Sequence, residues 1–333
     1  MKKSVIVISA IFGITLFFTS CASNKLKLKK VEGEPVSFKE TWGFVLQKYE
    51  DEYNPEFPLT DVCHYYADLN CYGEMIDVPK RSNLVVAEGT RVHFGMCCQS
   101  VSLTHFVINP EFGLRDKVIS DIVKAASDYD GLQLDFEYVP RRDKNAYLEF
   151  VKEVRRQLDE QGKEQMLSVC VPGRYKISES DIYPYKELSQ LCDRVFVMAY
   201  DEHWSTSKPG PVASTEWSKN VVDFAVTQIP EDKLVMGMPL YGRTWSNKST
   251  SRDWYFETLA RTLKENGVKK INYEDEVPMF TYKTEVEVTG YFNDIHSVVN
   301  FCRIYKDAGA NKVGFWRVGF EEENFWDWIS IEE

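Results

Sequence analysis

The residues best suited to chemistry in this sequence are two carboxylates, Asp135 and Glu137, within the stretch 130–137 (DGLQLDFE). Apolar and polar residues alternate there, and a period of two is that of a β-strand with one apolar and one polar face. The two carboxylates therefore share a face, with backbone origins roughly 6.6–6.8 Å apart. Buried carboxylates are costly unless another group pairs with them or uses them. The pattern allows either a strand with a solvated face or a strand that carries an acid/base pair.

Such a pair needs a scaffold, and short strand-like runs recur along the chain with helical segments between them. Eight strands are expected, at 42–46, 62–66, 91–98, 130–137, 166–171, 194–200, 233–239 and 312–316. Helical spacing is found at 116–129 and 146–158, with further candidates at 221–226 and 297–308. This alternation predicts an α/β fold, and the strand count favours a (β/α)8 TIM barrel. An open doubly wound sheet is the alternative, although no G-x-G-x-x-G or P-loop sequence supports it.

One interval between the seventh strand and the next helix is too long for a simple loop. We expect a small α+β insertion at about 246–290, with a helix at 254–267 and a strand at 280–288.

Polar and aromatic residues follow several of the expected strands, and the C-terminal strand ends form the active site of such barrels. Asp135 and Glu137 end the fourth strand. The residues that end or follow the sixth, seventh and eighth strands are Met198, Tyr200, Asp201, Tyr241, Arg243 and Trp316. A single strand-end Tyr or Trp is commonly part of the core. Together with two carboxylates, these groups predict a site for a polyhydroxylated ring.

The N-terminus has the features of a bacterial lipoprotein signal. Lys2 and Lys3 precede an apolar run at 5–18, and small residues then precede Cys21. We expect a signal peptide at 1–21, lipidation of Cys21, a polar tether at 22–38 and the barrel at 39–333. The protein would then be an exported, membrane-anchored lipoprotein at the periplasmic face or cell surface. An ordinary cleaved signal is the alternative.

The net charge and the spacing of potential metal ligands argue against some classes of binding partner. The 333-residue chain has a net charge of −11, which argues against nucleic acid as the main target. Seven cysteines besides Cys21 cannot all pair within the chain, and a bond between Cys63 and Cys71 or one involving Cys97 or Cys98 stays open. The five histidines lack H-x-H or HExxH spacing, so a metal-dependent hydrolase using Asp135 and Glu137 as ligands is the weakest hypothesis, and no cofactor is expected.

The sequence resembles glycoside hydrolase family 18, the family of chitinases and related N-acetylglucosaminidases. That family's D-G-x-D-x-D-x-E motif on the fourth strand is matched by Asp130, Gly131, Asp135 and Glu137. Its Met-x-Tyr-Asp, Tyr-Gly-Arg and eighth-strand Trp are matched by residues 198–201, residues 241–243 and Trp316. The match runs from about Trp42 to the C-terminus.

The resemblance implies a retaining mechanism in which the substrate's own 2-acetamido carbonyl is the nucleophile. Glu137 would be the general acid and then the base, Asp135 would orient the acetamido N–H, and Tyr200 would hydrogen-bond the acetamido carbonyl. The implied substrate contacts are Gln133, Met198, Asp201, Tyr241, Arg243 and Trp316. The implied partner is an oligo- or polysaccharide with β-linked N-acetylglucosamine, and the protein is expected to act as a monomer.

Gln133 departs from the family's commoner motif, which has a third Asp at this position. A group of members acting on bacterial cell walls and spore cortex also has an amide there. We therefore expect peptidoglycan or N-glycans ahead of chitin. A catalytically silent, chitinase-like lectin is the alternative, but such relatives typically lose the acid at the position of Glu137, which this chain keeps.

Overall fold

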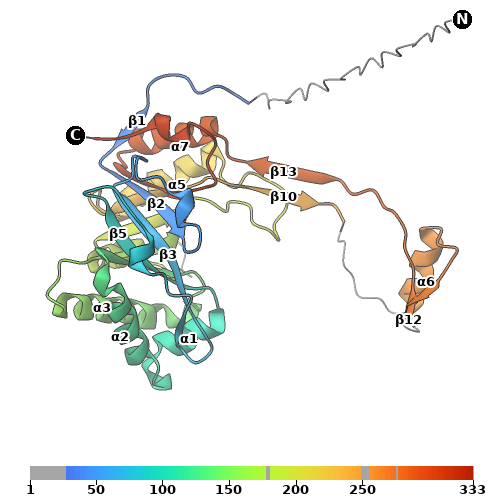
Figure 1. Cartoon of the computed structure of the whole chain (residues 1–333), viewed down its shortest axis with the longest axis horizontal. Helices are drawn as coiled ribbons and strands as arrows, with labels where there is room; N and C mark the ends of the chain where they lie inside the picture. The colour runs from blue at the N-terminus through green and yellow to red at the C-terminus, as the bar shows by residue number, and fades with distance from the viewer. Residues whose placement is uncertain (1–27, 178–180, 249–255, 275–276, 333) are drawn as a thin grey trace, which may run out of the picture. The chain divides into compact units, whose positions relative to one another are not determined.

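The computed structural model describes residues 28–177, 181–248, 256–274 and 277–332 (Figure 1). The expected signal peptide and Cys21 lie outside these residues. By their contacts, residues 31–333 form one compact unit, and the description below concerns that unit. In the described part of the chain, no helix is both long and apolar enough to cross a bilayer.

Eight parallel strands form a closed barrel. They are β2 (Glu40–Leu46), β3 (Asp61–Leu69), β5 (Arg91–Cys98), β6 (Gly131–Phe136), β7 (Met166–Pro172), β8 (Arg194–Met198), β9 (Leu234–Pro239) and β14 (Lys312–Trp316). Each strand pairs with the next, β14 pairs with β2, and the pairing of β2 with β3 closes the ring. A ninth strand, β4 (Met75–Ile76), is antiparallel to the end of β3. The (β/α)8 prediction is confirmed, and the open-sheet alternative is wrong.

From β5 onward, α-helices connect the strands and cover the barrel from outside, whereas the connections from β2 to β3 and from β3 to β5 contain only 3-10 helices and β4. They are α1 (Val101–Ile108), α2 (Arg115–Ala125), α3 (Lys144–Glu160), α4 (Tyr185–Leu191), α5 (Thr215–Gln228) and α7 (Ile295–Asp307). Short 3-10 helices lie at 50–52, 81–83, 110–112, 126–128, 141–143 and 325–328. In α2 the buried face is an apolar stripe with helical spacing, formed by Val118, Ile119, Ile122 and Val123. Figure 1 shows α2 and α3 beside one another along the strands.

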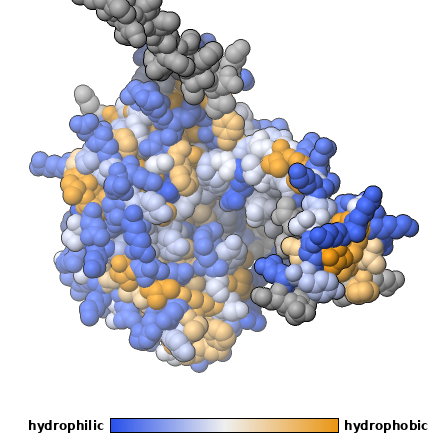
Figure 2. Space-filling view, turned by 45° about the vertical axis from the view of Figure 1, so that its right-hand side comes forward, coloured by the Kyte–Doolittle hydropathy of each residue, from blue (hydrophilic) through white to orange (hydrophobic). Residues whose placement is uncertain are grey.

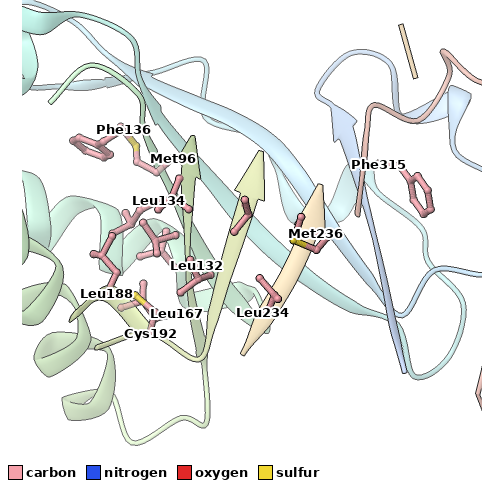
Figure 3. Close-up of a cluster of buried hydrophobic side chains, with 14 of the residues drawn as sticks. Met96, Leu132, Leu134, Phe136, Leu167, Leu188, Cys192, Leu234, Met236 and Phe315 are labelled. Atoms are coloured by element: carbon pink, nitrogen blue, oxygen red, sulfur yellow. The ribbon is translucent and has the colours of Figure 1, made fainter. Parts of the chain in front are cut away.

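The core has two parts, inside and outside the strand ring. Figure 3 shows the outer part, in which Leu132, Leu134 and Phe136 of β6 meet apolar side chains of the neighbouring strands and of α4. The barrel interior is filled by a second cluster: Trp42, Phe44, Cys63, Tyr65, Cys97, Cys170, Phe196 and Val235. On the face drawn in Figure 2, hydrophilic residues predominate. Because the apolar residues of β6 face outward, its alternating partners Gln133 and Asp135 face the barrel interior.

The insertion contains β10 (Gly242–Ser246), α6 (Phe256–Glu265), β11 (Asn272–Glu274), β12 (Val277–Met279) and β13 (Val288–Phe292). Strands β10 and β13 pair antiparallel, with Arg243 opposite Tyr291. The helix lies within the predicted range 254–267. The strand predicted at 280–288 is wrong, because β12 ends at Met279 and β13 begins only at Val288. Residues 280–287 are rich in Thr, Tyr and Val, but strand propensity needs a partner strand to be realised.

The expected boundary between tether and barrel is also wrong. Residues Val36–Phe38, predicted inside the tether at 22–38, form β1, which pairs in parallel with β15 (Ile329–Ile331). Phe38 is fully buried, and Arg303 of α7 donates a 2.5 Å hydrogen bond to the carbonyl of Glu32. The alternation of Val36, Ser37 and Phe38 gives this segment an apolar face that the chain's C-terminal end covers. The folded unit therefore begins before residue 39.

Candidate active site

Strand β6 holds the central pair at the C-terminal end of the barrel. The Asp130 carboxylate fixes the start of this strand by accepting a 2.7 Å hydrogen bond from the backbone N–H of Val92. Gly131 is required where β6 meets β7, since a Cβ there would lie 2.8 Å from the Met166 carbonyl oxygen. These two residues position the strand, whereas Asp135 lies opposite Cys97 in the register with β5.

Asp135 and Glu137 lie close enough to act together. One oxygen of each carboxylate and the Cys97 sulfur lie within 4.8 Å of one another. Asp135 is only 4% exposed, whereas Glu137 is partly open to solvent. The Tyr65 hydroxyl donates to Asp135 Oδ2 at 2.5 Å, and the amide of Gln99 donates to Glu137 Oε1. Asp135 Oδ1 is buried and has no hydrogen-bond partner.

The electrostatics of the pair favour retention of a proton. Burial, followed by repulsion from Glu137, raises the pKa of Asp135 to about 7, despite the hydrogen bond from Tyr65. Burial also raises the pKa of Glu137, with a contribution from the Asp201 charge and an opposing one from Gln99. Among the described residues, neither carboxylate forms an ion pair with a Lys or Arg. The two raised pKa values favour a proton on the pair near neutral pH, which a general acid requires.

A second polar cluster follows strands β8 and β9. Asp201 accepts hydrogen bonds from the Tyr241 hydroxyl at 2.5 Å and from Arg243 Nη2 at 2.7 Å. The Tyr200 and Tyr241 rings meet edge to face, 6.3 Å between centroids. Asp201 has a φ of 60°, a left-handed conformation that Asp tolerates better than bulkier residues. Three partly exposed polar side chains are thus held in one arrangement, and the Asp201 charge acts on Glu137.

Trp316 ends β14 over the aromatic interior. Its ring meets Phe44 and Tyr65 with centroid separations of 5.2 and 5.0 Å. Met198, Tyr200 and Trp316 are partly buried against the same interior cluster. A partly exposed Trp supported from below in this way offers a flat apolar surface at the mouth of the barrel.

Gln133 lies deeper than the other predicted site residues. Its side chain is fully buried, and neither its Oε1 nor its Nε2 has a hydrogen-bond partner. It precedes Asp135 by two positions on the same face of β6, so it lies below Asp135 in the barrel. The expected direct contact with a sugar does not fit this position, because Gln133 has no exposed surface.

Sequence reasoning missed three residues that surround the pair: Tyr65, Cys97 and Gln99. Tyr65 lies in the middle of β3, opposite the last residue of β2, Cys97 lies near the C-terminal end of β5, and Gln99 directly follows β5. The strand-end rule that selected residues on the sixth, seventh and eighth strands applies equally to the second and third. The same signal in the sequence therefore points to Tyr65, Cys97 and Gln99 as well.

Cys97, Asp135 and Glu137 are also the one cluster of three potential metal ligands among the described residues. The histidines that form ion pairs lie elsewhere, with His64 beside Glu50, His93 beside Asp61 and His105 beside Asp143. The seven cysteines of the described chain are free thiols, so the disulfides left open by the sequence are not formed.

Comparison with known proteins places this geometry in a family. The model of Glycosyl hydrolases family 18 matches residues 113–321, more than half of the chain. The uncharacterized glycosylase YvbX of Bacillus subtilis is 33% identical over 211 residues, which are 60% of this chain and 60% of YvbX. The chain thus spans less than two thirds of that relative's length.

Two solved structures share the fold. The spore cortex-lytic enzyme SleL of Bacillus cereus has a TM-score of 0.68 and 20% identity, covering 91% of this chain and 76% of SleL. A GH18 chitinase mutant of Cycas revoluta, in complex with (GlcNAc)4, has a TM-score of 0.64 and 20% identity, covering 86% of this chain and 97% of the chitinase. With the closed barrel and the motif residues gathered at its mouth, the family match shows that the chain belongs to glycosyl hydrolases family 18.

Proposed function

We propose that this protein is a retaining glycoside hydrolase that cleaves β-linked N-acetylglucosamine-containing glycans with help from the substrate's acetamido group. The observation that carries the proposal is the Asp135–Glu137 pair, whose nearest oxygens lie within 4.8 Å at the mouth of a closed barrel. Inverting glycosidases need roughly 6.5–9.5 Å between their carboxyl groups to admit a water. The short separation here favours retention of configuration.

The burial of Asp135 argues against this carboxylate as the nucleophile. Its side chain is 4% exposed, and the Tyr65 hydroxyl engages one of its oxygens. A nucleophile from the substrate itself removes the need for Asp135 to reach the anomeric carbon. In this mechanism Glu137 protonates the leaving oxygen, and Asp135 accepts the acetamido N–H and stabilises the positive charge that develops on that group.

The remaining residues of the mouth would bind the sugar. Tyr200 would donate its hydroxyl proton to the acetamido carbonyl. Asp201, Tyr241 and Arg243 already form one hydrogen-bonded unit, and their free donors and acceptors suit sugar hydroxyls. Trp316 would stack beneath the ring, with Met198 beside it. Gln133 would act from below, on Asp135.

Peptidoglycan is the preferred substrate class. Support comes from the fold shared with a spore cortex-lytic enzyme and from the amide at Gln133, which resembles the group of the family that acts on cell walls. The chitinase solved with (GlcNAc)4 supports the N-acetylglucosamine unit itself.

The test compares chromogenic chitobiose with chromogenic cellobiose, which carries a hydroxyl where chitobiose carries the acetamido group. We expect the chitobioside to be hydrolysed, with the β-anomer of the product formed first, as measured by NMR. We expect no hydrolysis of the cellobioside. An α-anomer, or equal rates on both, would contradict substrate assistance. Mass spectrometry of products from peptidoglycan, chitin oligomers and a high-mannose glycan then ranks the substrates.

A lectin is the alternative. If the wild-type protein binds these sugars but releases no product from any of them, the enzyme proposal fails. Retention of Glu137 and its raised pKa favour the enzyme.

We also propose that Cys21 is lipidated and anchors the protein to a membrane, at the periplasmic face or the cell surface. The sequence at 1–21 supports this proposal. Metabolic labelling with a palmitate analogue in a bacterial host should mark the wild type but not Cys21→Ser. Equal labelling of the two would contradict it.

A further inference from the structure

The mouth of the barrel contains a thiol that the proposed mechanism does not use. The Cys97 side chain is 1% exposed, and its sulfur lies within 4.8 Å of an oxygen of both Asp135 and Glu137. From these contacts we propose that Cys97, Asp135 and Glu137 form a binding site for a thiophilic divalent cation, such as Zn²⁺ or Cd²⁺, and that the bound cation inhibits the enzyme.

The distances fit such an ion after small side-chain movements. A cation centred between three atoms separated by 4.8 Å or less lies at most about 2.8 Å from each, whereas Zn²⁺ bonds to sulfur at about 2.3 Å and to carboxylate oxygen at about 2.0–2.2 Å. The sulfur therefore needs to move inward by roughly 0.5 Å at most, and each carboxylate oxygen by roughly 0.6–0.8 Å at most. Rotation about the side-chain bonds of Glu137, which is partly exposed, supplies movement on the open side.

A second, independent observation points to a ligand. Asp135 Oδ1 is buried and has no hydrogen bond of normal geometry; Oδ2 is bound by Tyr65, and the Cys170 thiol is the other neighbour of the carboxylate. A buried polar atom without a partner is costly. A cation coordinated by Oδ1 would satisfy it without disturbing the hydrogen bond from Tyr65.

The charge of the site favours a cation. Asp135 and Glu137 repel each other, and Asp201 adds a third negative charge nearby. Arg243 pairs with Asp201, and in the part of the chain that the structure describes neither Asp135 nor Glu137 forms an ion pair with a lysine or arginine. A divalent ion would relieve the repulsion that no lysine or arginine relieves at the pair itself.

The donor set selects the kind of cation. One thiolate with two carboxylates suits Zn²⁺ and Cd²⁺, whereas Mg²⁺ and Ca²⁺ require oxygen ligands throughout. Binding releases the thiol proton and any proton on the carboxylates to solvent, and three metal–ligand bonds form without oxidation or reduction. Glu137 can then no longer transfer a proton, so the cation and the substrate exclude one another.

The experiment titrates the protein with Cd²⁺ and follows the ultraviolet charge-transfer band of a cadmium–thiolate bond. Cys71 is an exposed thiol that would compete for Cd²⁺, so the titration uses Cys71→Ser as the background. That variant should show one saturable band, which Cys97→Ser added to it should abolish. Cys302→Ser added instead should leave the band, because Cys302 is an equally buried thiol outside the barrel ring.

Glu137→Gln keeps the thiol and tests the carboxylate side of the site. Cadmium affinity should fall at least about tenfold. Loss of a group that only hydrogen-bonds a metal ligand already lowers metal affinity by about that factor. Absence of a band in Cys71→Ser, or a band that survives Cys97→Ser, overturns the inference. Circular dichroism checks that each variant is folded.

The inhibitory consequence rests on the proposed function, and the binding measurement does not. With an active enzyme, micromolar Zn²⁺ should inhibit hydrolysis competitively and EDTA should restore it, while Mg²⁺ should have no effect. Loss of activity in EDTA with recovery on added Zn²⁺ would overturn the inhibitory role and make the cation a cofactor. If no substrate is cleaved, the cadmium band still decides whether the site exists.

Discussion

The two ends of the barrel each bury an aspartate, and the two aspartates have opposite properties. At the N-terminal end, Asp61 of β3 is fully buried and accepts two hydrogen bonds from Arg91, at 2.7 and 2.8 Å, and one from His93 at 2.8 Å. Burial alone would raise the pKa of Asp61, but His93 and Arg91 outweigh it and lower that pKa to about 2.

At the C-terminal end, Asp135 is buried almost as completely but has a hydroxyl as its hydrogen-bonding partner and a second carboxylate as its neighbour. Burial, followed by repulsion from Glu137, raises the pKa of Asp135 to about 7, because no cation is paired with Asp135 to offset them as Arg91 is with Asp61. The same side chain, at similar burial in the same barrel, is therefore a permanent anion at one end and a proton carrier at the other. Partner charges, rather than burial, decide which.

The N-terminal end continues this pattern of paired charges. Glu40, which begins β2, accepts a 2.8 Å hydrogen bond from Arg194 of β8 and also lies 3.3 Å from Arg91. Trp42 stacks on His93 with 4.4 Å between centroids. Residues at this face of a barrel serve stability, and those at the opposite face serve catalysis. Mutations at the two ends should therefore separate the two properties.

The largest effect is expected at Glu137. Glu137→Gln removes the proton donor and should lower kcat by about 10²–10⁴-fold, with the melting temperature nearly unchanged because the side chain is partly exposed. Glu231→Gln, at the opposite end of the barrel and paired with the exposed Lys39, is the matched control. An equal loss of activity in both variants would contradict the assignment.

Asp61→Asn should instead lower the stability of the protein and leave its activity nearly unchanged. It leaves the buried His93 and the partly exposed Arg91 against a neutral group. Breaking a fully buried ion pair costs about 3–5 kcal/mol, and because Arg91 is 37% exposed and also pairs with Glu40, the cost here should lie toward the lower end of that range. Urea unfolding at pH 7 measures this cost, and kcat per folded molecule should stay close to wild type. Asp121→Asn, which breaks an exposed pair with Lys117, should cost no more than about 1 kcal/mol.

The cost of Asp61→Asn should also depend on pH. Because the folded pKa of Asp61 is depressed to about 2, its stabilising effect is complete above the unfolded value of about 3.9 and disappears as the pH falls toward 2. A cost that stays constant from pH 7 to pH 2 would contradict the ion-pair explanation.

The sequence predicted the elements of this barrel better than the contacts between them. The alternation in 131–136 identified β6 and its inward carboxylates, and the strand-end rule found Asp201, Tyr241, Arg243 and Trp316. The bonds that join these residues were not predictable, since the link from Tyr241 to Asp201 spans 40 residues and depends on how β8 and β9 close the ring.

The pairing at the other end was missed for the same reason. Asp61 and His93 lie 32 residues apart in sequence, and only the parallel register of β3 and β5 brings them together. Val36–Phe38 was assigned to the tether because its partner, β15, lies at the far end of the chain. In each case a local sequence pattern is enough to predict a strand, but the function of its residues depends on a partner that lies far away in the sequence.

Asp135→Asn should change stability with the opposite pH dependence to Asp61→Asn. Because folding raises the pKa of Asp135 from about 3.9 to about 7, the folded state holds more protons than the unfolded one between these values. Wild-type stability therefore falls as the pH rises through that window, and Asn removes the penalty. The variant should gain stability relative to wild type at pH 8, by a few kcal/mol at most at about 1.4 kcal/mol per pKa unit, and little at pH 4. Equal differences in the free energy of unfolding at both pH values would exclude a buried charge as the cause.

The smallest effect is expected at Tyr65, whose hydroxyl stabilises the charged form of Asp135 through a 2.5 Å hydrogen bond. Tyr65→Phe should raise the pKa of the carboxyl pair, so that the pH profile of kcat/KM moves to higher pH. A single hydrogen bond contributes about 0.5–1.5 kcal/mol, which limits the displacement to about one pH unit. Tyr66→Phe is the control, because Tyr66 packs on the same interior cluster without bonding Asp135. If both variants displace the pH profile equally, the displacement is caused by altered packing at the barrel mouth and not by loss of the hydrogen bond. The hydroxyl of Tyr65 would then have no part in the contrast between Asp61 and Asp135.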